Sequence, residues 1–159
     1  MSQTRSRAIR QASVATESPA IDLDFLPTLL GYNIRRAQIS LWRDFTRNVA
    51  DGEVRPSVFS VLSLANANSG IAQIDIANQL GIDKASVVAL IDRLEAQRWV
   101  VRKRSTEDRR RQEIFLTAAG VKAYRTIKKE MIAHERKFAD RFTDGERKQL
   151  ISLLQRLHV

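Results

Sequence analysis

Apolar residues recur at intervals of three or four along most of the chain, which is the spacing of amphipathic helices. The first segment with this spacing runs from Phe25 to Val49. Asp22 or Asp24 can cap its start, and Pro27 is tolerated in its first turn. Its apolar residues cover two flanks, which is more surface than one small core can bury. We therefore expect this helix to be buried on two sides.

Five further helices are predicted, so the fold class is mainly α. Their ends carry recognisable signals: a proline in a first turn, glycines that accept a left-handed backbone, and threonines that cap. The last helix starts at the capping box "TDGE". The helices are expected over Pro56 to Asn66, Gln73 to Leu80 and Lys84 to Gln97, then after Thr117 and after Thr143.

Two short β-prone runs, "WVVRKR" and "QEIFLT", interrupt the helical pattern. Charged residues separate them, so the pair is predicted to form a small β-hairpin with a basic tip. A charged loop of this kind is most often simply solvated. Its neighbours in the chain must therefore decide whether the tip binds anything.

The segment before the hairpin has small and apolar residues at a characteristic spacing, namely Ala77, Gly81, Val87, Leu90 and Leu94. Alanine lets the next helix cross closely, glycine permits a left-handed turn, and the larger residues anchor the second helix on the first. This spacing is typical of a helix-turn-helix, although unrelated helix pairs also show it. The hairpin directly after it favours a winged helix, with the second helix in a DNA major groove and the basic hairpin, or wing, over the neighbouring minor groove.

The chain carries 27 lysines and arginines against 18 aspartates and glutamates, a formal net charge of +9. Such an excess points to an acidic partner, and double-stranded DNA comes first. The chain has no cysteine and two histidines, so thiol chemistry, a metal site and a histidine-based triad are not expected, nor is any cofactor. No apolar run reaches the roughly 20 residues of a membrane helix, so we expect a cytoplasmic protein without a membrane partner.

The stretch "IDIANQLGIDKASVVALIDRLEAQRWVVRKRSTEDRRRQEIFLTAAG" resembles the MarR regulators, a family named for multiple antibiotic resistance. The most specific parts are "DRR" in the wing and "LTAAG" at the start of the next helix. The resemblance implies a winged helix-turn-helix domain with N- and C-terminal helices that form a homodimer. The expected parts are a disordered basic tail over 1–20, a dimerisation helix over 21–52, the DNA-binding domain over 53–117 and dimerisation helices over 118–159.

The resemblance also implies roles for residues of the wing. Asp108 would brace the wing through a salt bridge to an arginine of the same motif, and Arg110 would enter the minor groove. Arg109 and Arg111 would add phosphate contacts, and Arg104 belongs to the same set of expected DNA contacts.

On the second helix of the pair, the recognition helix, the period leaves a small and largely apolar face outward. It comprises Lys84, Ala85, Ser86, Val88, Ala89 and Asp92. Many family members carry threonine and arginine where this chain has Val88 and Ala89, so the usual bidentate arginine to guanine is missing. We expect Ala85, Val88 and Ala89 to read thymine methyls, Ser86 to contact a phosphate or a base, and Lys84 to position the helix. A further departure is Arg98, where a glycine often ends this helix.

Members of the family commonly bind a small molecule between the dimerisation helices and the winged helix. In "GYNIRRAQISLWRDF", aromatic and apolar residues lie near arginines, which suits an aromatic ring with an anionic group. The stretch also looks like a subgroup that controls aromatic-acid and hydroxycinnamate degradation and responds to aryl-CoA thioesters. The candidate effector residues are Tyr32, Arg35, Arg36, Ile39, Trp42 and Arg43, for which ordinary core packing and solvated charge is the alternative.

Taken together, the sequence predicts a DNA-binding transcriptional regulator, a repressor that binds a pseudo-palindromic operator as a homodimer. Three alternatives stay open: a non-specific architectural DNA-binding protein, a regulator without a ligand, and an activator. An enzyme is not expected, because no nucleophile lies beside a histidine and no glycine-rich phosphate loop occurs.

Overall fold

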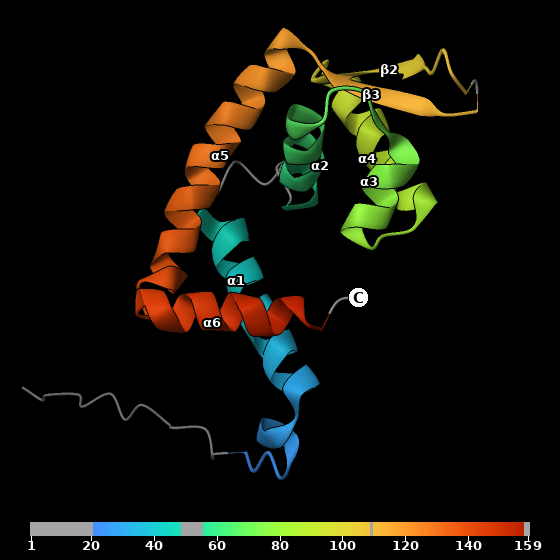
Figure 1. Ribbon diagram of the computed structural model, residues 1–159. Helices are drawn as coiled ribbons and strands as arrows, with labels where there is room; N and C mark the ends of the chain where they lie inside the picture. The colour runs from blue at the N-terminus through green and yellow to red at the C-terminus, as the bar shows by residue number, and fades with distance from the viewer. Residues whose placement is uncertain (1–20, 49–55, 109, 158–159) are drawn as a thin grey trace, which may run out of the picture. The chain divides into compact units, whose positions relative to one another are not determined.

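The computed structural model describes residues 21–48, 56–108 and 110–157 (Figure 1). The chain divides into two compact units, Met1–Arg36 and Ala37–Val159. The expected basic tail over 1–20 lies outside the described residues. No helix in the described part of the chain is long and apolar enough to cross a membrane.

The first unit corrects the predicted start of the first helix. A short 3₁₀ helix, η1, covers Leu26–Thr28, Leu29 is extended, and α1 runs over Leu30–Asn48. The side-chain amide of Asn33 donates to the carbonyls of Pro27 and Leu29, at 2.8 Å each, and thereby stabilises this break. The prediction of a continuous helix from Phe25 is wrong because the Asn33 side chain binds the carbonyls of Pro27 and Leu29, and Leu29 is extended.

The two aspartates proposed as caps do not cap α1. The main-chain N–H of Asp24 donates to the Asp22 carboxylate at 2.9 Å, and Asp24 has a positive φ of 49°. Both residues therefore lie six or more positions before α1 begins.

The second unit contains the remaining helices and a three-stranded sheet. The helices are α2 (Pro56–Ala67), α3 (Gln73–Leu80), α4 (Lys84–Ala96), α5 (Ala118–Ala139) and α6 (Asp144–Gln155). These bounds confirm the predicted helices to within a few residues. The strands are β1 (Ile71–Ala72), β2 (Val100–Arg104) and β3 (Gln112–Leu116).

The sheet is antiparallel in the order β1-β3-β2. β2 and β3 form the predicted hairpin, in register from Val100↔Leu116 to Arg104↔Gln112. β1 was not predicted, because two residues are too short to show an alternating pattern. Gly70 precedes it with a φ of 82° and donates to the Ile114 carbonyl at 3.1 Å, which brings β1 onto β3.

The core lies where α2, α3, α4 and α5 meet the sheet. α2, α3, α4 and the sheet each contribute fully buried side chains. α5 contributes Tyr124 and Ile127, which are buried but keep a small exposed fraction. On α4, Val87, Ile91 and Leu94 are fully buried and Leu90 packs against them, as the helical period predicted. Burial of this kind fixes α4 on α3 and leaves its opposite face in solvent.

Two positions around α4 have a left-handed backbone. Gly81 ends α3 with a φ of 61°, as the helix-turn-helix spacing predicted. Arg98, two residues after α4, has a φ of 58°. Arginine at this position adopts a backbone conformation that costs a side-chain-bearing residue about 1 kcal/mol, which is a physical reason for the glycine that the family resemblance leads one to expect here.

The start of α5 packs tightly against the residue that leads into β2. Thr117 caps the helix, its hydroxyl oxygen accepting from the Gly120 N–H at 3.0 Å. The Thr117 N–H donates to the Trp99 carbonyl at 3.0 Å, and the same carbonyl faces Gly120. The glycine of "LTAAG" therefore permits a close approach between α5 and the strand entry.

Candidate nucleic-acid interface

The N-terminus of α4 is organised by Asp83, which sequence reasoning overlooked although an aspartate directly before a helix is a common cap. Its carboxylate accepts from the Ser86 N–H at 2.9 Å and from the Ser86 hydroxyl at 2.6 Å. These two hydrogen bonds lower the pKa of Asp83, and the one from the hydroxyl has the larger effect. The Ser86 hydroxyl is thus used as a donor within the protein, and its oxygen remains an acceptor.

The outer face of α4 carries the small residues that the helical period predicted. Its first turn and the following turn are exposed, and Val88 is 38% exposed. The exposed members are Lys84, Ala85, Ser86, Val88 and Ala89. The face combines one cation with methyl groups, so it can make apolar contacts with a partner.

The tip of the wing, residues 105–111, is a hydrogen-bonded turn. The Ser105 N–H donates to the Arg111 carbonyl at 3.0 Å, and the Arg111 N–H donates to the Asp108 carbonyl at 2.8 Å. Ser105 is 5% exposed, and its hydroxyl oxygen accepts from the Glu107 N–H at 3.3 Å. The described residues on either side of Arg109 are thus joined by main-chain hydrogen bonds in spite of their charge.

Asp108 and Arg110 form the salt bridge within the wing motif that the family resemblance implied. Oδ1 of Asp108 accepts from the Arg110 N–H at 3.0 Å and from its Nε at 3.3 Å. The Arg110 side chain is nevertheless 92% exposed. Asp108 thus orients an arginine that extends into solvent. Arg109 lies outside the described residues, and Arg104 is exposed at the end of β2.

Three ion pairs that were not predicted, made by two arginines, join the wing to the helix-turn-helix. Arg102 of β2 pairs with Asp92 and Glu95 of α4, and its guanidinium donates to the Val88 carbonyl at 3.1 Å. Arg111 pairs with Asp75 of α3 at 2.7 Å. The partners are distant in sequence from each other, so no local pattern indicated the pairing.

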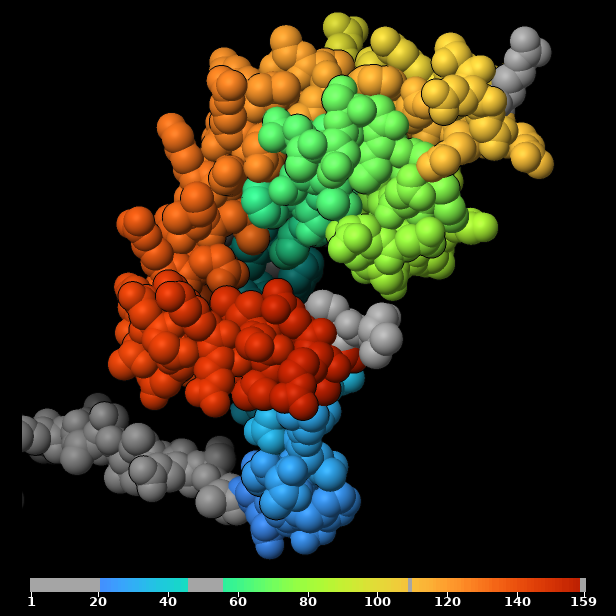
Figure 2. Space-filling view, viewed as in Figure 1, coloured from blue at the N-terminus to red at the C-terminus, as the bar shows by residue number. Residues whose placement is uncertain are grey.

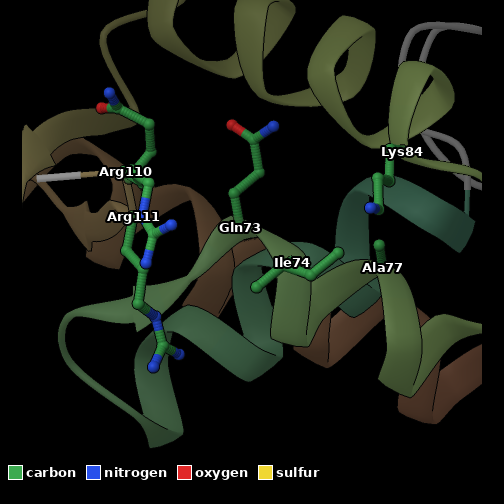
Figure 3. Close-up of a pocket in the computed structure, with 7 residues that line it drawn as sticks. Gln73, Ile74, Ala77, Lys84, Arg110 and Arg111 are labelled. Atoms are coloured by element: carbon green, nitrogen blue, oxygen red, sulfur yellow. The ribbon is translucent and has the colours of Figure 1, made fainter. Parts of the chain in front are cut away.

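A cleft of about 160 Å³ lies between the helix-turn-helix and the wing (Figure 3). It is lined from α3 by Gln73, Ile74 and Ala77, from α4 by Lys84, and from the wing by Arg110, Arg111 and Gln112. Figure 3 shows the two arginines on one side, Lys84 on the other and Gln73 between them. Three predicted DNA-binding residues thus gather around one cleft, and Gln73 is a further polar residue there that the sequence did not single out.

The six candidate effector residues all belong to α1. Tyr32, Arg35 and Arg36 belong to the first unit, and Ile39, Trp42 and Arg43 to the second. Within the second unit, the Trp42 ring stacks on Phe45 with centroids 6.3 Å apart.

Phe45 connects α1 to α5. It is buried, and its ring meets the edge of the His134 ring with centroids 5.5 Å apart. The imidazole Nε2 of buried His134 lies 3.3 Å from the Asp44 carboxylate. An aromatic and titratable cluster thus fixes the C-terminal half of α1 on α5, next to Trp42.

Helix α6 is exposed along its length, as Figure 2 shows for the red segment. Its capping box is formed as predicted. The hydrogen bonds from Thr143 lower the pKa of Glu146, and the one from the Thr143 backbone has the larger effect. The exposed apolar residues at this end are Leu150, Ile151, Leu153, Leu154 and Leu157. Such a row of exposed leucines and isoleucine on one chain is typical of an interface.

Comparisons with known proteins agree with this arrangement. A model of the MarR family matches residues 54–111. A protein of Thauera aromatica, described as a transcriptional regulatory protein for the hcr operon, is 35% identical over 130 residues, which cover 81% of this chain and 78% of that protein.

Two solved structures of the transcriptional repressor CouR are similar to the chain. CouR bound to a 23-mer DNA duplex is 35% identical, with a TM-score of 0.82 over 88% of this chain and 99% of the other. CouR bound to p-coumaroyl-CoA is 34% identical, with a TM-score of 0.77 over 87% of this chain and 97% of the other.

Proposed function

We propose a specific role for this chain within the MarR family of transcriptional regulators, to which it belongs: a homodimeric repressor that an aromatic acid or its CoA thioester releases from a pseudo-palindromic operator. The observation that carries the proposal is the winged helix itself, in which the exposed N-terminal face of α4 and the exposed Arg110 border one cleft. A recognition helix and a basic wing so placed suit adjacent major and minor grooves.

In this proposal α4 reads the major groove mainly through apolar contacts. Ala85, Val88 and Ala89 would contact thymine methyls, and Lys84 would position the helix on the backbone. Because the Ser86 hydroxyl donates to Asp83, its oxygen is suited to accept from a base amino group rather than to donate to a phosphate. The operator is therefore expected to be rich in A·T pairs under α4.

Changing Ala89 to serine is expected to alter operator preference, since it replaces a methyl contact with a hydroxyl at the exposed centre of the reading face. The measurement is binding-site selection from random duplexes with both proteins, followed by affinity measurements on each selected site. A shift of about 1–3 kcal/mol in relative affinity between the two sites is expected. If the variant returns the same site with the same affinity, the assignment of Ala89 fails.

The homodimer is proposed from the apolar residues that a single chain leaves exposed. α6 has no buried residue and carries the row of leucines described above, and η1 with the start of α1 adds Leu26, Leu29 and Leu30. Two-fold symmetry would then place the half-site centres about one helical turn of DNA apart. Residues 21–52 and 118–159 are the proposed dimerisation segments.

The effector is proposed to bind near α1. The stacked pair of Trp42 and Phe45, with Arg43 between them in sequence, suits an aromatic ring that bears a negative group. The sequence-based candidates Tyr32, Arg35, Arg36 and Ile39 belong to the same helix. Support comes from CouR, about a third identical, whose structure contains p-coumaroyl-CoA. The effector can act only by binding the DNA-free form more tightly than the DNA-bound form.

A thermal-shift screen of aromatic acids, their CoA thioesters and CoA alone tests this proposal. A true effector at about a hundred times its Kd should stabilise the protein by about 2.7 kcal/mol. Trp42→Ala is expected to reduce that shift, and the active compound is expected to weaken operator binding. Stabilisation by none of these compounds would count against the effector site and favour a ligand-independent regulator.

The architectural alternative is tested by competition at fixed salt. A regulator of one operator is expected to prefer the selected site to unrelated duplex by about a thousandfold or more. A protein that coats DNA without sequence choice would be displaced from the labelled duplex equally well by the selected site and by the unrelated duplex.

A further inference from the structure

The tip of the wing projects beyond the part of the sheet that the rest of the second unit holds. β1 pairs with β3 at Ile71↔Ile114 and Ala72↔Glu113, so its support ends one residue before Gln112, the last residue of the hairpin register. The hairpin register ends at Arg104↔Gln112, and residues 105–111 follow without a further strand partner in the described chain. The direction of the tip therefore depends on contacts made by its own side chains.

Arg111 makes such a contact at the base of the tip. Its Nη2 donates to Oδ2 of Asp75, in the first turn of α3, at 2.7 Å. Among the residues that the structure describes, this is the ion pair that connects 105–111 to the helix-turn-helix, since the Asp108 and Arg110 pair lies within the tip. The Arg111 main chain is hydrogen-bonded to Ser105 and Asp108, so moving Arg111 moves the segment that carries Arg110.

We propose that Asp75 and Arg111 are a positioning pair, which aims Arg110 at the minor groove, and that Arg111 is not a phosphate contact. This inference rests on the proposed function of the wing. It replaces the role that the sequence suggested for Arg111. Arg111 would be a positioning residue, and Asp75 would be an acid that strengthens binding to a polyanion.

The effect of removing Asp75 on DNA affinity distinguishes a positioning pair from a phosphate contact by Arg111. Both side chains are about half exposed, 51% for Asp75 and 48% for Arg111, so the pair sits where DNA would approach. If Arg111 moved to a phosphate, Asp75 would be left as an unpaired negative charge beside the DNA. Removing that charge would then tighten binding. If the pair positions the tip, removing Asp75 must loosen binding, because the wing loses its direction before it meets the groove.

The test uses the full-length chain and the duplex that it selects from a random pool. Asp75→Asn and Arg111→Gln are each expected to weaken binding by about twofold to fivefold, which is what one exposed ion pair can contribute. The double variant should be no weaker than either single variant, because both changes break one interaction. The slope of log affinity against log salt should stay unchanged, since no phosphate contact is lost in the complex.

Glu107→Gln is the matched control. Glu107 is an exposed acid of the same tip, and its carboxylate forms no ion pair with any residue that the structure describes. Removing its charge should leave binding unchanged or slightly tighter. Circular dichroism and thermal unfolding of each variant verify that the fold is retained.

Three results would overturn the inference: tighter or unchanged binding by Asp75→Asn, a loss from Arg111→Gln in which the salt slope falls by about one, or losses that add in the double variant. Failure of the proposed function looks different. In that case the wild-type chain itself selects no duplex, or binds selected and unrelated duplexes equally.

Discussion

Replacing Arg110 with alanine is expected to weaken operator binding by about tenfold to a hundredfold, roughly 1–3 kcal/mol. The Arg110 side chain is 92% exposed, and Asp108 orients it from within the same turn. An arginine so held can enter a narrow minor groove, where the electrostatic potential is most negative. The measurement is a titration of the selected duplex by fluorescence anisotropy at fixed salt, with dimerisation followed by analytical ultracentrifugation.

The matched control for this change is Arg125→Ala on α5. Arg125 is exposed and forms no ion pair with the described part of the chain, so the variant removes the same charge away from the wing. It should bind DNA almost as well as the wild type. Because Arg125 lies in the proposed dimerisation segment 118–159, ultracentrifugation should also show that this variant and Arg110→Ala have the same assembly state as the wild type. An affinity of Arg110→Ala equal to that of Arg125→Ala would refute the placement of Arg110 in the groove.

Gly120→Ala is expected to give the largest loss of stability in the chain. A Cβ atom on Gly120 would overlap the carbonyl oxygen of Trp99 and lie 2.8 Å from its carbonyl carbon. These are main-chain atoms, and the oxygen also accepts the Thr117 N–H, so neither side can move without breaking the junction of α5 and β2. Overpacking of this kind typically costs about 1–3 kcal/mol, and a backbone clash belongs at or above the upper end.

Urea or thermal unfolding measures this effect, and Gly145→Ala is its control. An added Cβ on Gly145, in the first turn of α6, meets no atom within 4 Å. That variant should unfold at or above the wild-type temperature, since alanine favours a helix over glycine. A Gly120→Ala protein as stable as the Gly145→Ala protein would show that α5 does not approach Trp99 as closely as described.

Much of the fold followed from the sequence because its signals are local. The limits of α3 and α4, the left-handed Gly81, the caps Thr117 and Thr143, and the hairpin all depend on residues within a few positions of one another. The start of α1 was not predicted correctly because it depends on side-chain hydrogen bonds of Asn33. Asn33 competes for the carbonyls of the preceding turn, and propensity alone does not reveal which hydrogen bonds its side chain makes.

The parts of the site that could not be predicted are those that depend on tertiary contacts. The pairs Arg111 with Asp75 and Arg102 with Asp92 join elements that only the folded chain brings together. The wing motif itself could be predicted, and the Asp108 to Arg110 salt bridge confirms that part of it. The assignments of Lys84, Ala85, Ser86, Val88, Ala89 and the arginines to DNA stay predictions until binding is measured.

Arg102 has a mechanical consequence for the proposed release of DNA. By joining β2 to Val88, Asp92 and Glu95, it couples the base of the wing to the recognition helix. In the proposed mechanism, a small tilt of that helix would move the base of the wing with it, so an effector would need no separate route to each. Release of a half-site is therefore expected to occur in one step, with the helix and the wing leaving the DNA together, rather than by the gradual loss of one contact after another.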